Sequence, residues 1–421
     1  MEKLTVAGVK INQTSFKRLF FSKTMLIAYA LLILAGVGVF ELFHLRYFSD
    51  ALTAHDAGLD PTNPALKEAM RQAVFGTVGE IDRNLPWTIL ISNYMYMIYT
   101  GSGIIFLVTL AELMQFKIVA KAAAGFIVTG IAMVFAGLFT IATDLNMLNI
   151  HYMFLTPNFK AAMWMMLPLY SVYIPFVLFE IYLILTENRK WAMRLALPIL
   201  VLSVGIDIIE YYIQAKLFSM NTARHLWTEF PLLVFYFIIS AFVSALGVMG
   251  IYSFLVHHKK PEFEELMDLI RKALLFFVFV LGIYEIVGYM TVDKEWAFLI
   301  LFGPFSKLYF IGYVMLTLAL PFLFVVKPGK PIYTLIASVC VLLGSFAGRF
   351  LFVYGGNANP MSNRFGTGYE KYEMYSVAKE FIYNAPHLGE IFIVVGSIGV
   401  SMIIYKLFDR LFSVEQFREH H

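Results

Sequence analysis

Long apolar runs recur through most of the chain, and each is close to or above the length of a membrane-spanning helix. Residues 87–113 and 120–141 form the clearest pair, joined by a short basic link. A helix needs about 20 predominantly apolar residues to cross a bilayer. The composition agrees, because 60% of the 421 residues are hydrophobic and 14% are charged. We therefore predict an all-α integral membrane protein that lies in a lipid bilayer.

The apolar runs predict about ten transmembrane helices, after a polar and basic N-terminal segment at residues 1–23. The predicted helices span residues 24–44, 87–113, 120–142, 162–185, 191–213, 229–256, 272–290, 296–326, 331–354 and 386–408. Gly303 and Pro304 lie inside the eighth run, where we expect a break in the helix. Residues 24–421 are thus expected to form a single polytopic membrane domain.

The distribution of Lys and Arg predicts the orientation of these helices. Both residue types are more frequent in the segments on the side of the N-terminus than in the longer loops on the other side. By the positive-inside rule, both termini lie in the cytoplasm of a multi-pass protein of the cytoplasmic (inner) membrane. The long loops at residues 45–85 and 355–385 then face outward. Residues 1–23 lack the cleavage site of a signal peptide, so the first run is expected to remain as an anchor.

The stretch from residue 86 to residue 152 is the most informative part of the chain. The four small residues at 100–103 lie in its first helix and predict that another helix approaches closely there. Its second helix ends near Asp144, and His151 and Tyr152 follow in a polar segment. An acid and a His/Tyr pair where a helix leaves the lipid favour one wall of a site at a membrane surface.

Ionisable side chains inside the predicted helices are the main functional signal, because each is costly in a bilayer unless it is paired or reaches water. Most of them are predicted to lie in the outer half of the membrane: Glu41, His44, Asp144, Asp207, Glu210, Glu285, Lys307, Arg349 and Glu390. Glu112 and Glu180 lie toward the cytoplasm. This bias favours a site that opens outward, or a proton path that leads from one.

The deep residues also have a structural interpretation. Asp207 could form a fixed ion pair with Arg349 or Lys307, which would lock parts of the helix bundle together. Glu112 and Glu180 could pair with cytoplasmic Lys or Arg residues. In this interpretation the charges neutralise one another and carry no function.

The residues near the predicted outer surface have similar alternatives. Glu41 and His44 could simply reach interfacial water, and Asp144 could pair with Lys160. Tyr99 could be a packing residue. A passive membrane anchor would need nothing more than these roles.

Cysteine and histidine usage limits the cofactors of this chain. The single cysteine, Cys340, rules out an internal disulfide and a cysteine-ligated iron–sulfur cluster. A membrane haem b needs a pair of histidines within helices, and His44 is the one histidine convincingly inside or at the edge of a helix. We therefore expect no haem and no metal site. The net charge of +3 is too small to indicate a nucleic-acid partner.

Several segments resemble one family of membrane proteins, the NrfD/PsrC family of polysulfide reductase-type, quinone-interacting membrane subunits, in its ten-helix branch. The similar segments are Tyr99-Thr100-Gly101-Ser102-Gly103, Thr143-Asp144-Leu145, residues 225–247, Gly348-Arg349-Phe350 and Ala385-Pro386-His387-Leu388-Gly389-Glu390. One departure lies after Asp144, where the family often continues Asp-Leu-Gly-x-Pro and this chain reads Asp-Leu-Asn-Met-Leu.

The resemblance implies a fold and a role. It implies two four-helix bundles, formed by predicted helices 2–5 and 6–9, with helices 1 and 10 flanking them. It also implies a quinone site without a bound redox cofactor, for a quinone expected to be of the menaquinone type. The chain would then be the quinone-reactive subunit of a respiratory oxidoreductase and not active alone. Its implied partners are an iron–sulfur (ferredoxin-like) subunit and a molybdopterin-type catalytic subunit on the outer face.

The resemblance also suggests which residues form this site. It places the site at the outer end of the first bundle, with a histidine of helix 1 and a tyrosine or acid near the end of helix 3. Glu41, His44 and Asp144 are the expected catalytic residues, and the residues expected to contact the quinone are His44, His151, Tyr152 and Tyr99. A histidine beside a carboxylate at the water boundary exchanges protons near neutral pH, which quinone chemistry requires.

A proton path is the second expectation, and it rests on the depth of the buried charges. Its expected members are Asp207, Glu210, Glu285, Lys307 and Arg349. A secondary transporter remains an alternative, because transporters also have broken helices and buried charge pairs. Against it, the polar residues are predicted nearer to one surface than to the middle of the membrane.

Overall fold

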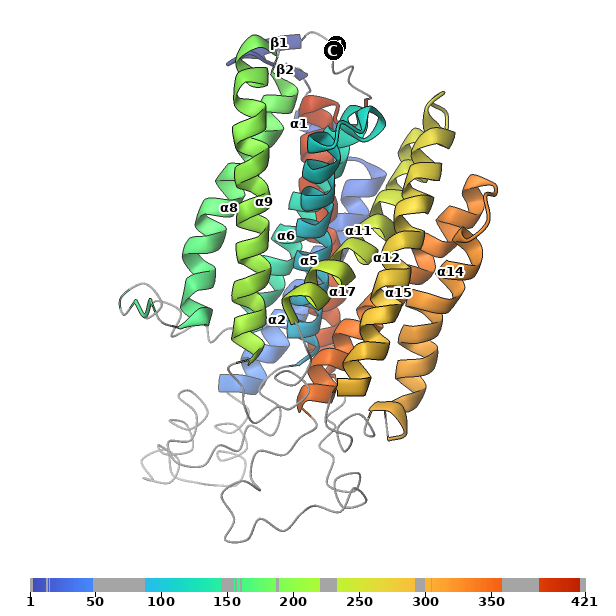
Figure 1. The fold of residues 1–421 in the computed structure, drawn as a ribbon. Helices are drawn as coiled ribbons and strands as arrows, with labels where there is room; N and C mark the ends of the chain where they lie inside the picture. Colours follow the sequence, from blue (N-terminus) through green and yellow to red (C-terminus); the bar gives the residue numbers. More distant parts are fainter. Residues whose placement is uncertain are drawn as a thin grey trace, which may run out of the picture.

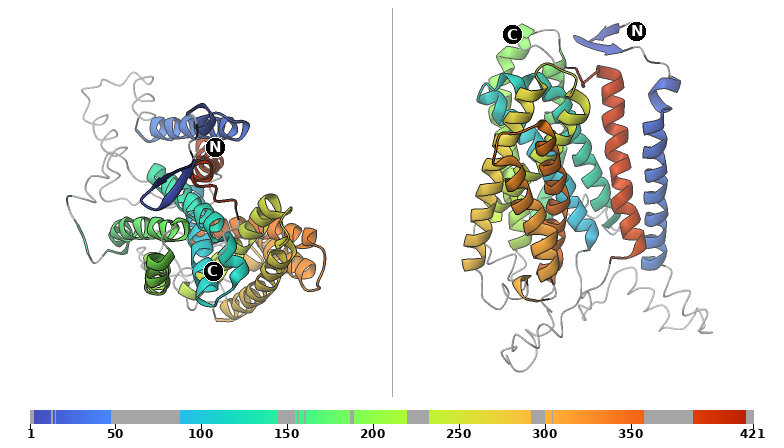
Figure 2. Two further views of the ribbon diagram at one scale, coloured as in Figure 1. Left: turned by 90° about the horizontal axis from the view of Figure 1, so that it is seen from above. Right: turned by 90° about the vertical axis from the view of Figure 1, so that its right-hand side faces the viewer.

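The computed structural model describes residues 3–12, 14, 16–47, 88–144, 155, 157–159, 161–186, 189–219, 233–291, 300–303, 305–357 and 386–416. Long helices that run up and down make up most of this part of the chain (Figure 1). Both chain termini lie at the same end of the helix bundle (Figure 2). We call this the terminal end, and the opposite end the distal end.

The long helices alternate in direction between these two ends. In chain order they are α2 (Lys23–Tyr47), α5 (Ile89–Leu113), α6 (Lys117–Asp144), α8 (Ala162–Leu185), α9 (Arg189–Ser219), α11 (Leu233–His257), α12 (Phe263–Thr291), the π-helix η1 (Leu308–Ala319) that continues into α14 (Leu320–Val325), α15 (Pro331–Asn357) and α17 (Leu388–Phe412). Within the described residues, nine segments are long and apolar enough to cross a membrane. The 29-residue α12 runs beside them. The prediction of an all-α integral membrane protein is confirmed.

Four helices, α5, α6, α8 and α9, pack around one interior, which we call the first bundle. The small residues at 100–103 make its close contacts, as the sequence predicted. A Cβ on Gly101 would lie 2.5 Å from the carbonyl oxygen of Gly130 in α6, and one on Gly103 would lie 2.8 Å from that of Ala241 in α11. The absence of side chains at these glycines therefore lets α5 contact two helices at backbone distance.

The second bundle consists of α11, α12, η1 with α14, and α15. It packs against the first bundle through contacts of α11 and α15 with α5 and of α11 with α9. Helices α2 and α17 form a separate pair at one edge (Figure 2), and α17 packs this pair mainly onto α6. Asn93 of α5 helps to hold α17 there, because its amide nitrogen donates to Thr140 of α6 and to Ser397 of α17, both at 3.0 Å.

The eighth predicted helix is broken where the sequence indicated. Residues 300–301 are helical, the chain turns at Gly303, and the helix resumes at Ser306. The resumed helix is a 12-residue π-helix, which the sequence did not predict. It packs closely on α15, because a Cβ on Gly344 would lie 2.6 Å from the backbone nitrogen of Thr317. π-helical turns occur frequently at functional sites.

The N-terminal segment is more ordered than the predicted polar tail. It forms a β-hairpin of β1 (Lys3–Val6) and β2 (Val9–Asn12), followed by the short helix α1 (Phe16–Phe20). The hairpin lies at the terminal end, where Asn12 donates to the carbonyl oxygen of Arg410 at 3.0 Å. The hydroxyl of Tyr182 in α8 donates to the carbonyl oxygen of Ala7. The hairpin thus joins the two chain termini to the first bundle.

Candidate functional site

A chain of buried hydrogen bonds crosses the interior of the first bundle. The hydroxyl of Tyr99 in α5 donates to the Oε1 of Gln214 in α9 at 3.1 Å, and the Nε2 of Gln214 donates to the hydroxyl of Tyr170 in α8 at 2.9 Å. Tyr170 in turn donates to Oε1 of Glu210 in α9 at 2.8 Å. All four side chains are buried. Tyrosine and glutamine can both donate and accept, so this chain links three helices and ends on a carboxyl group.

A second contact in the same bundle involves the small-residue stretch of α5. Ser102 and Tyr211 of α9 share a hydrogen bond of 2.9 Å between their hydroxyl oxygens. Because Tyr211 lies next to Glu210 in sequence, α9 presents polar groups to both α5 and α8. The small-residue stretch of α5 thus contributes a hydrogen bond to the polar interior and also allows close helix packing.

Asp207 lies one helical turn before Glu210 in α9 and is fully buried. Neither of its carboxylate oxygens has a hydrogen-bond partner among the described residues. No cation in the described part of the chain lies within ion-pair distance of it, and the charged groups that act on it are Glu210 and Glu180. The alternative in which Asp207 forms a fixed ion pair with Arg349 or Lys307 is therefore wrong for this structure.

Arg349 of α15 lies between the two bundles and is 3% exposed. Its guanidinium carbon is 4.6 Å from the centroid of the Tyr99 ring, and its Nη2 donates to the hydroxyl of Ser240 at 2.7 Å. The rings of Tyr236 and Phe237 lie 5.6 Å away on other sides. Aromatic faces and a hydroxyl thus surround this buried cation, and Glu285 of α12 acts on it electrostatically.

Glu285 of α12 has its own partner in the second bundle. The hydroxyl of Tyr313 in η1 donates to its Oε1 at 2.6 Å, and both side chains are buried. Lys307 differs, because it is exposed at the start of η1. The structure therefore brings together four of the five residues of the expected proton path, in two neighbouring interiors, and leaves Lys307 on the surface.

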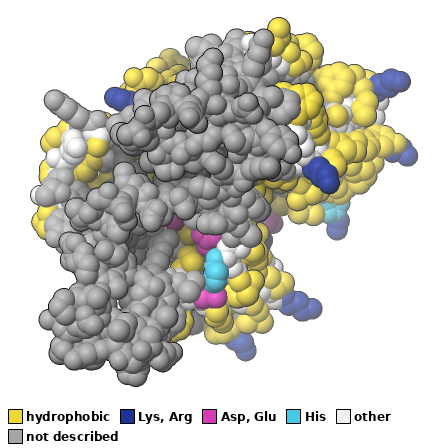
Figure 3. Space-filling model, turned by 90° about the horizontal axis from the view of Figure 1, so that it is seen from below, with side chains coloured by type: hydrophobic (Ala, Val, Ile, Leu, Met, Phe, Trp, Pro, Cys, Tyr) yellow, Lys and Arg dark blue, Asp and Glu magenta, His cyan; other side chains and the backbone are white. Residues whose placement is uncertain are grey.

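At the distal end, a histidine and a carboxylate from the flanking helices meet. The Nε2 of His387 is 3.7 Å from Oε1 of Glu41 in α2, and both side chains are partly exposed. His387 is also the N-cap of α17, because its Nδ1 accepts from the backbone N–H of Gly389. Glu390 completes a capping box by accepting from the backbone N–H of His387 at 2.9 Å. Figure 3 shows a histidine beside acidic side chains on this face.

The other residues expected at the surface site are less fully placed. His44 lies in the last turn of α2, one turn beyond Glu41, and its side chain is outside the described part. Asp144 is the last residue of α6 and is partly buried. His151 and Tyr152 lie outside the described residues. Tyr99 does not reach the surface, because its hydroxyl is part of the buried network.

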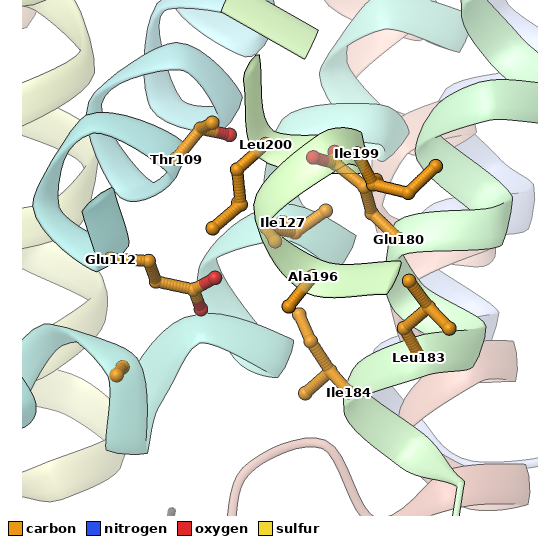
Figure 4. Close-up of a pocket in the computed structure, with 10 residues that line it drawn as sticks. Thr109, Glu112, Ile127, Glu180, Leu183, Ile184, Ala196, Ile199 and Leu200 are labelled. Atoms are coloured by element: carbon orange, nitrogen blue, oxygen red, sulfur yellow. The ribbon is translucent and has the colours of Figure 1, made fainter. Parts of the chain in front are cut away.

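A cavity of about 260 Å³ lies inside the first bundle, toward its terminal end. Glu112 of α5 and Glu180 of α8 line it from different helices, and Figure 4 shows the carboxyl group of Glu112 directed into the space. We expected these two acids to pair with Lys or Arg. In the described chain, no Lys or Arg nitrogen lies within 4 Å of either carboxyl group, so this expectation is not met. Both oxygens of Glu180 and Oε1 of Glu112 lack a hydrogen-bond partner there.

Sequence reasoning missed two residues of these networks. Gln214 lies beyond the predicted end of its helix at residue 213, whereas α9 continues to Ser219. His387 was noted as part of a family-like segment but not as a site residue. Glu390, three residues after it, is the acid of a capping box and could have identified His387 as the N-cap of a helix. Its contact with Glu41 could not be predicted, because the two lie far apart in sequence.

These elements define a polytopic α-helical membrane protein with ionisable groups both in its interior and at one membrane surface. Among the described residues, no group of three or more His, Cys, Asp and Glu side chains is arranged to hold a metal ion. The family model described as "Polysulphide reductase, NrfD" matches residues 77–360. The chain therefore belongs to the NrfD family, whose members are membrane subunits of quinone-interacting oxidoreductase complexes. No curated protein matches the chain.

Proposed function

We propose that this chain is the quinone-reactive subunit of a multi-subunit respiratory oxidoreductase, with its quinone site at the distal end. The observation that carries this proposal is the Glu41–His387 pair, 3.7 Å apart at the membrane surface. Glu41 lies one helical turn before His44 in α2, so the position of the pair is consistent with the expected site. The distribution of Lys and Arg supports a distal end that faces outward and termini that face the cytoplasm.

The residues at this end fit the chemistry of a quinone. A quinone needs hydrogen-bond partners for its carbonyl oxygens, an apolar surface for its tail and a group that exchanges protons with water. Glu41 and His387 supply partly exposed groups of the last kind, and α2 presents apolar side chains such as Phe40 beside them. His44 and Asp144 complete the proposed set, with His151 and Tyr152 as further candidates from the segment that follows α6.

The proposed partners follow from the family and from this location. An iron–sulfur subunit would dock on the outer face, where the loops at residues 45–85 and 355–385 are expected, and a molybdopterin-type subunit would lie beyond it. Most of both loops lies outside the described residues. The bound quinone would supply two-electron redox chemistry, and this chain would hold it and manage its protons.

A proton path through the bundles is the second part of the proposal. Asp207 and Glu210 lie in the first bundle, and the network continues through Tyr99 to the neighbourhood of Arg349. Glu285 lies beyond, in the second bundle. Support comes from the burial of these groups and from the hydrogen bonds that join Glu210 to the hydroxyl of Tyr99.

Substitution of the two distal histidines tests the quinone site. His387→Asn keeps an efficient N-cap, because asparagine is among the best N-cap residues. Its α17 should therefore form normally while the contact with Glu41 is lost. We expect His387→Asn and His44→Ala to assemble with the partners but to lose most quinol-dependent electron transfer. His258→Asn, at the terminal end, is the matched control.

The opposite result is equally clear. Quinol-dependent turnover at the wild-type rate in both assembled variants, with the control also normal, would contradict a quinone site at the distal end. Electron transfer between the isolated partners and artificial acceptors should be unchanged in every variant, which locates the loss in this subunit.

A further inference from the structure

The cavity near Glu112 and Glu180 is mostly apolar, and its lining comes from all four helices of the first bundle. The described lining residues are Thr109, Glu112, Ala120, Ile127, Glu180, Leu183, Ile184, Ala196, Ile199 and Leu200. No Lys or Arg is among them. Among them, Glu112 lies in the last turn of α5 and Ala120 in the first turn of α6, and both of these turns are at the terminal end. The cavity thus lies just inside the terminal end of the bundle.

Glu180 is the feature of the cavity that most needs an explanation. It is 4% exposed, and neither of its oxygens has a hydrogen-bond partner in the described chain. A carboxyl group in this position is costly within a membrane unless it carries a proton or meets water. Buried polar groups without protein partners are normally satisfied by bound water, and this cavity is large enough for several water molecules.

The unsatisfied groups continue from the cavity into the centre of the bundle. Beyond Glu180 lie the hydroxyl of Ser203, which acts on the carboxyl group of Glu180, and the hydroxyl of Tyr173, which acts on the carboxyl group of Asp207. None of these contacts has full hydrogen-bond geometry among the described residues. Glu210 follows, with one oxygen bonded to Tyr170 and the other without a partner. Electrostatic interactions join neighbouring members, from Glu112 to Glu180 and from Glu180 to Asp207.

The second bundle differs at the same end, because the pocket of about 380 Å³ there is lined by the cations Arg271 and Lys330 as well as by acids. Arg271 of α12 is 7% exposed, and its Nη1 donates to the carbonyl oxygen of Val325 at 2.8 Å. Its Nε and Nη2 contact the carboxylate of Asp268 at 2.9 and 2.8 Å. Val325 is fully buried behind this contact. A fixed cation at the mouth of a pathway opposes the passage of protons.

We propose that the cavity is a hydrated proton entrance from the terminal end, which serves the first bundle. Water in the cavity gives a proton to a carboxylate oxygen of Glu180. That proton then leaves Glu180 for Asp207 by way of the hydroxyls of Ser203 and Tyr173, and the cavity reprotonates Glu180. Glu112 supplies a second carboxyl group at the mouth. Delivery of these protons to quinone chemistry rests on the proposed function, whereas the hydrated entrance does not.

Labelling of a cysteine in the cavity tests the entrance without any quinone reaction. The background is the assembled complex with Cys340→Ser, in which this chain has no other cysteine. A membrane-impermeant maleimide should label Ala196→Cys from the terminal side and not from the distal side. Leu197→Cys, one residue further on and 64% exposed on the lipid-facing surface, is the matched control and should stay unlabelled. An unreactive Ala196→Cys, in a folded complex, would overturn the proposal.

Proton uptake by the complex in liposomes tests the role of the two acids. We expect Glu180→Gln to lower uptake from the terminal-side compartment by at least about tenfold, and Glu112→Gln to lower it less. Glu265→Gln, an exposed acid at the same end, should behave as wild type. Wild-type uptake in Glu180→Gln, with quinone turnover intact, would overturn this role and leave the quinone site standing. A wild-type complex that shows no quinone turnover would instead reject the proposed function.

Discussion

Arg349 places its guanidinium carbon 4.6 Å from the ring centroid of Tyr99, and this contact joins the two bundles. Arg349 belongs to the second bundle and Tyr99 to the first. The same tyrosine donates its hydroxyl to Gln214. The cation of one bundle thus rests on the aromatic face of a residue whose hydroxyl begins the acid network of the other.

Substitution of Arg349 should weaken the junction between the bundles. Lysine keeps the charge but not the planar group that stacks on aromatic rings, so Arg349→Lys should destabilise the protein by roughly 1–2 kcal/mol. Thermal unfolding of the purified complex in detergent measures this loss. Lys307→Met, at an exposed cation, should leave the unfolding temperature unchanged. An equal effect of the two substitutions would show that the stacking contributes nothing.

Asp207→Asn separates a proton relay from a structural role. No cation in the described chain pairs with Asp207, so the substitution leaves no charge unpaired. We therefore expect a normal yield of extracted complex, together with slower turnover or lost proton coupling. Yield, quinone reduction and proton uptake in liposomes are measured side by side. A low yield with normal activity per complex would favour the structural role.

Tyr313→Phe removes the hydrogen bond to Glu285 and leaves a buried carboxyl group without its donor. The expected loss of stability is about 1–3 kcal/mol, because an unsatisfied buried group loses its interaction with water as well. Tyr212→Phe is the matched control, since the side chain of Tyr212 is exposed. It should be neutral in thermal unfolding. Similar losses in both variants would show that the phenol oxygens act through packing instead.

Gly101→Ala tests the close contact between α5 and α6. The added Cβ would lie 2.5 Å from a backbone oxygen of α6, which cannot move aside as a side chain does. We expect a destabilisation of about 1–3 kcal/mol and a lower yield of folded protein. Gly205→Ala has open space around the new Cβ and should be neutral or stabilising by up to about 1 kcal/mol. A neutral Gly101→Ala would show that the helices separate at no cost.

The sequence by itself determined the class of the protein and most of its helices. Apolar runs of the right length indicate spanning helices because each backbone polar group in lipid must be satisfied within its own segment. The same logic located the break near Gly303 and the close approach at residues 100–103. Helix ends were less certain: α12 begins at Phe263, well before the predicted residue 272, because its first turns are charged and leave the apolar run.

Only the tertiary structure decided which polar groups meet. Counting residues along their helices places Asp207 and Arg349 at similar depths in the membrane. The rotation of the helices nevertheless turns Asp207 toward Glu180 and Arg349 toward Tyr99. His387 and Glu41 meet because α2 and α17 pack side by side, although almost the whole chain separates them. Depth along a helix follows from counting residues, but the partner of a side chain depends on how whole helices rotate and pack, which no local pattern records.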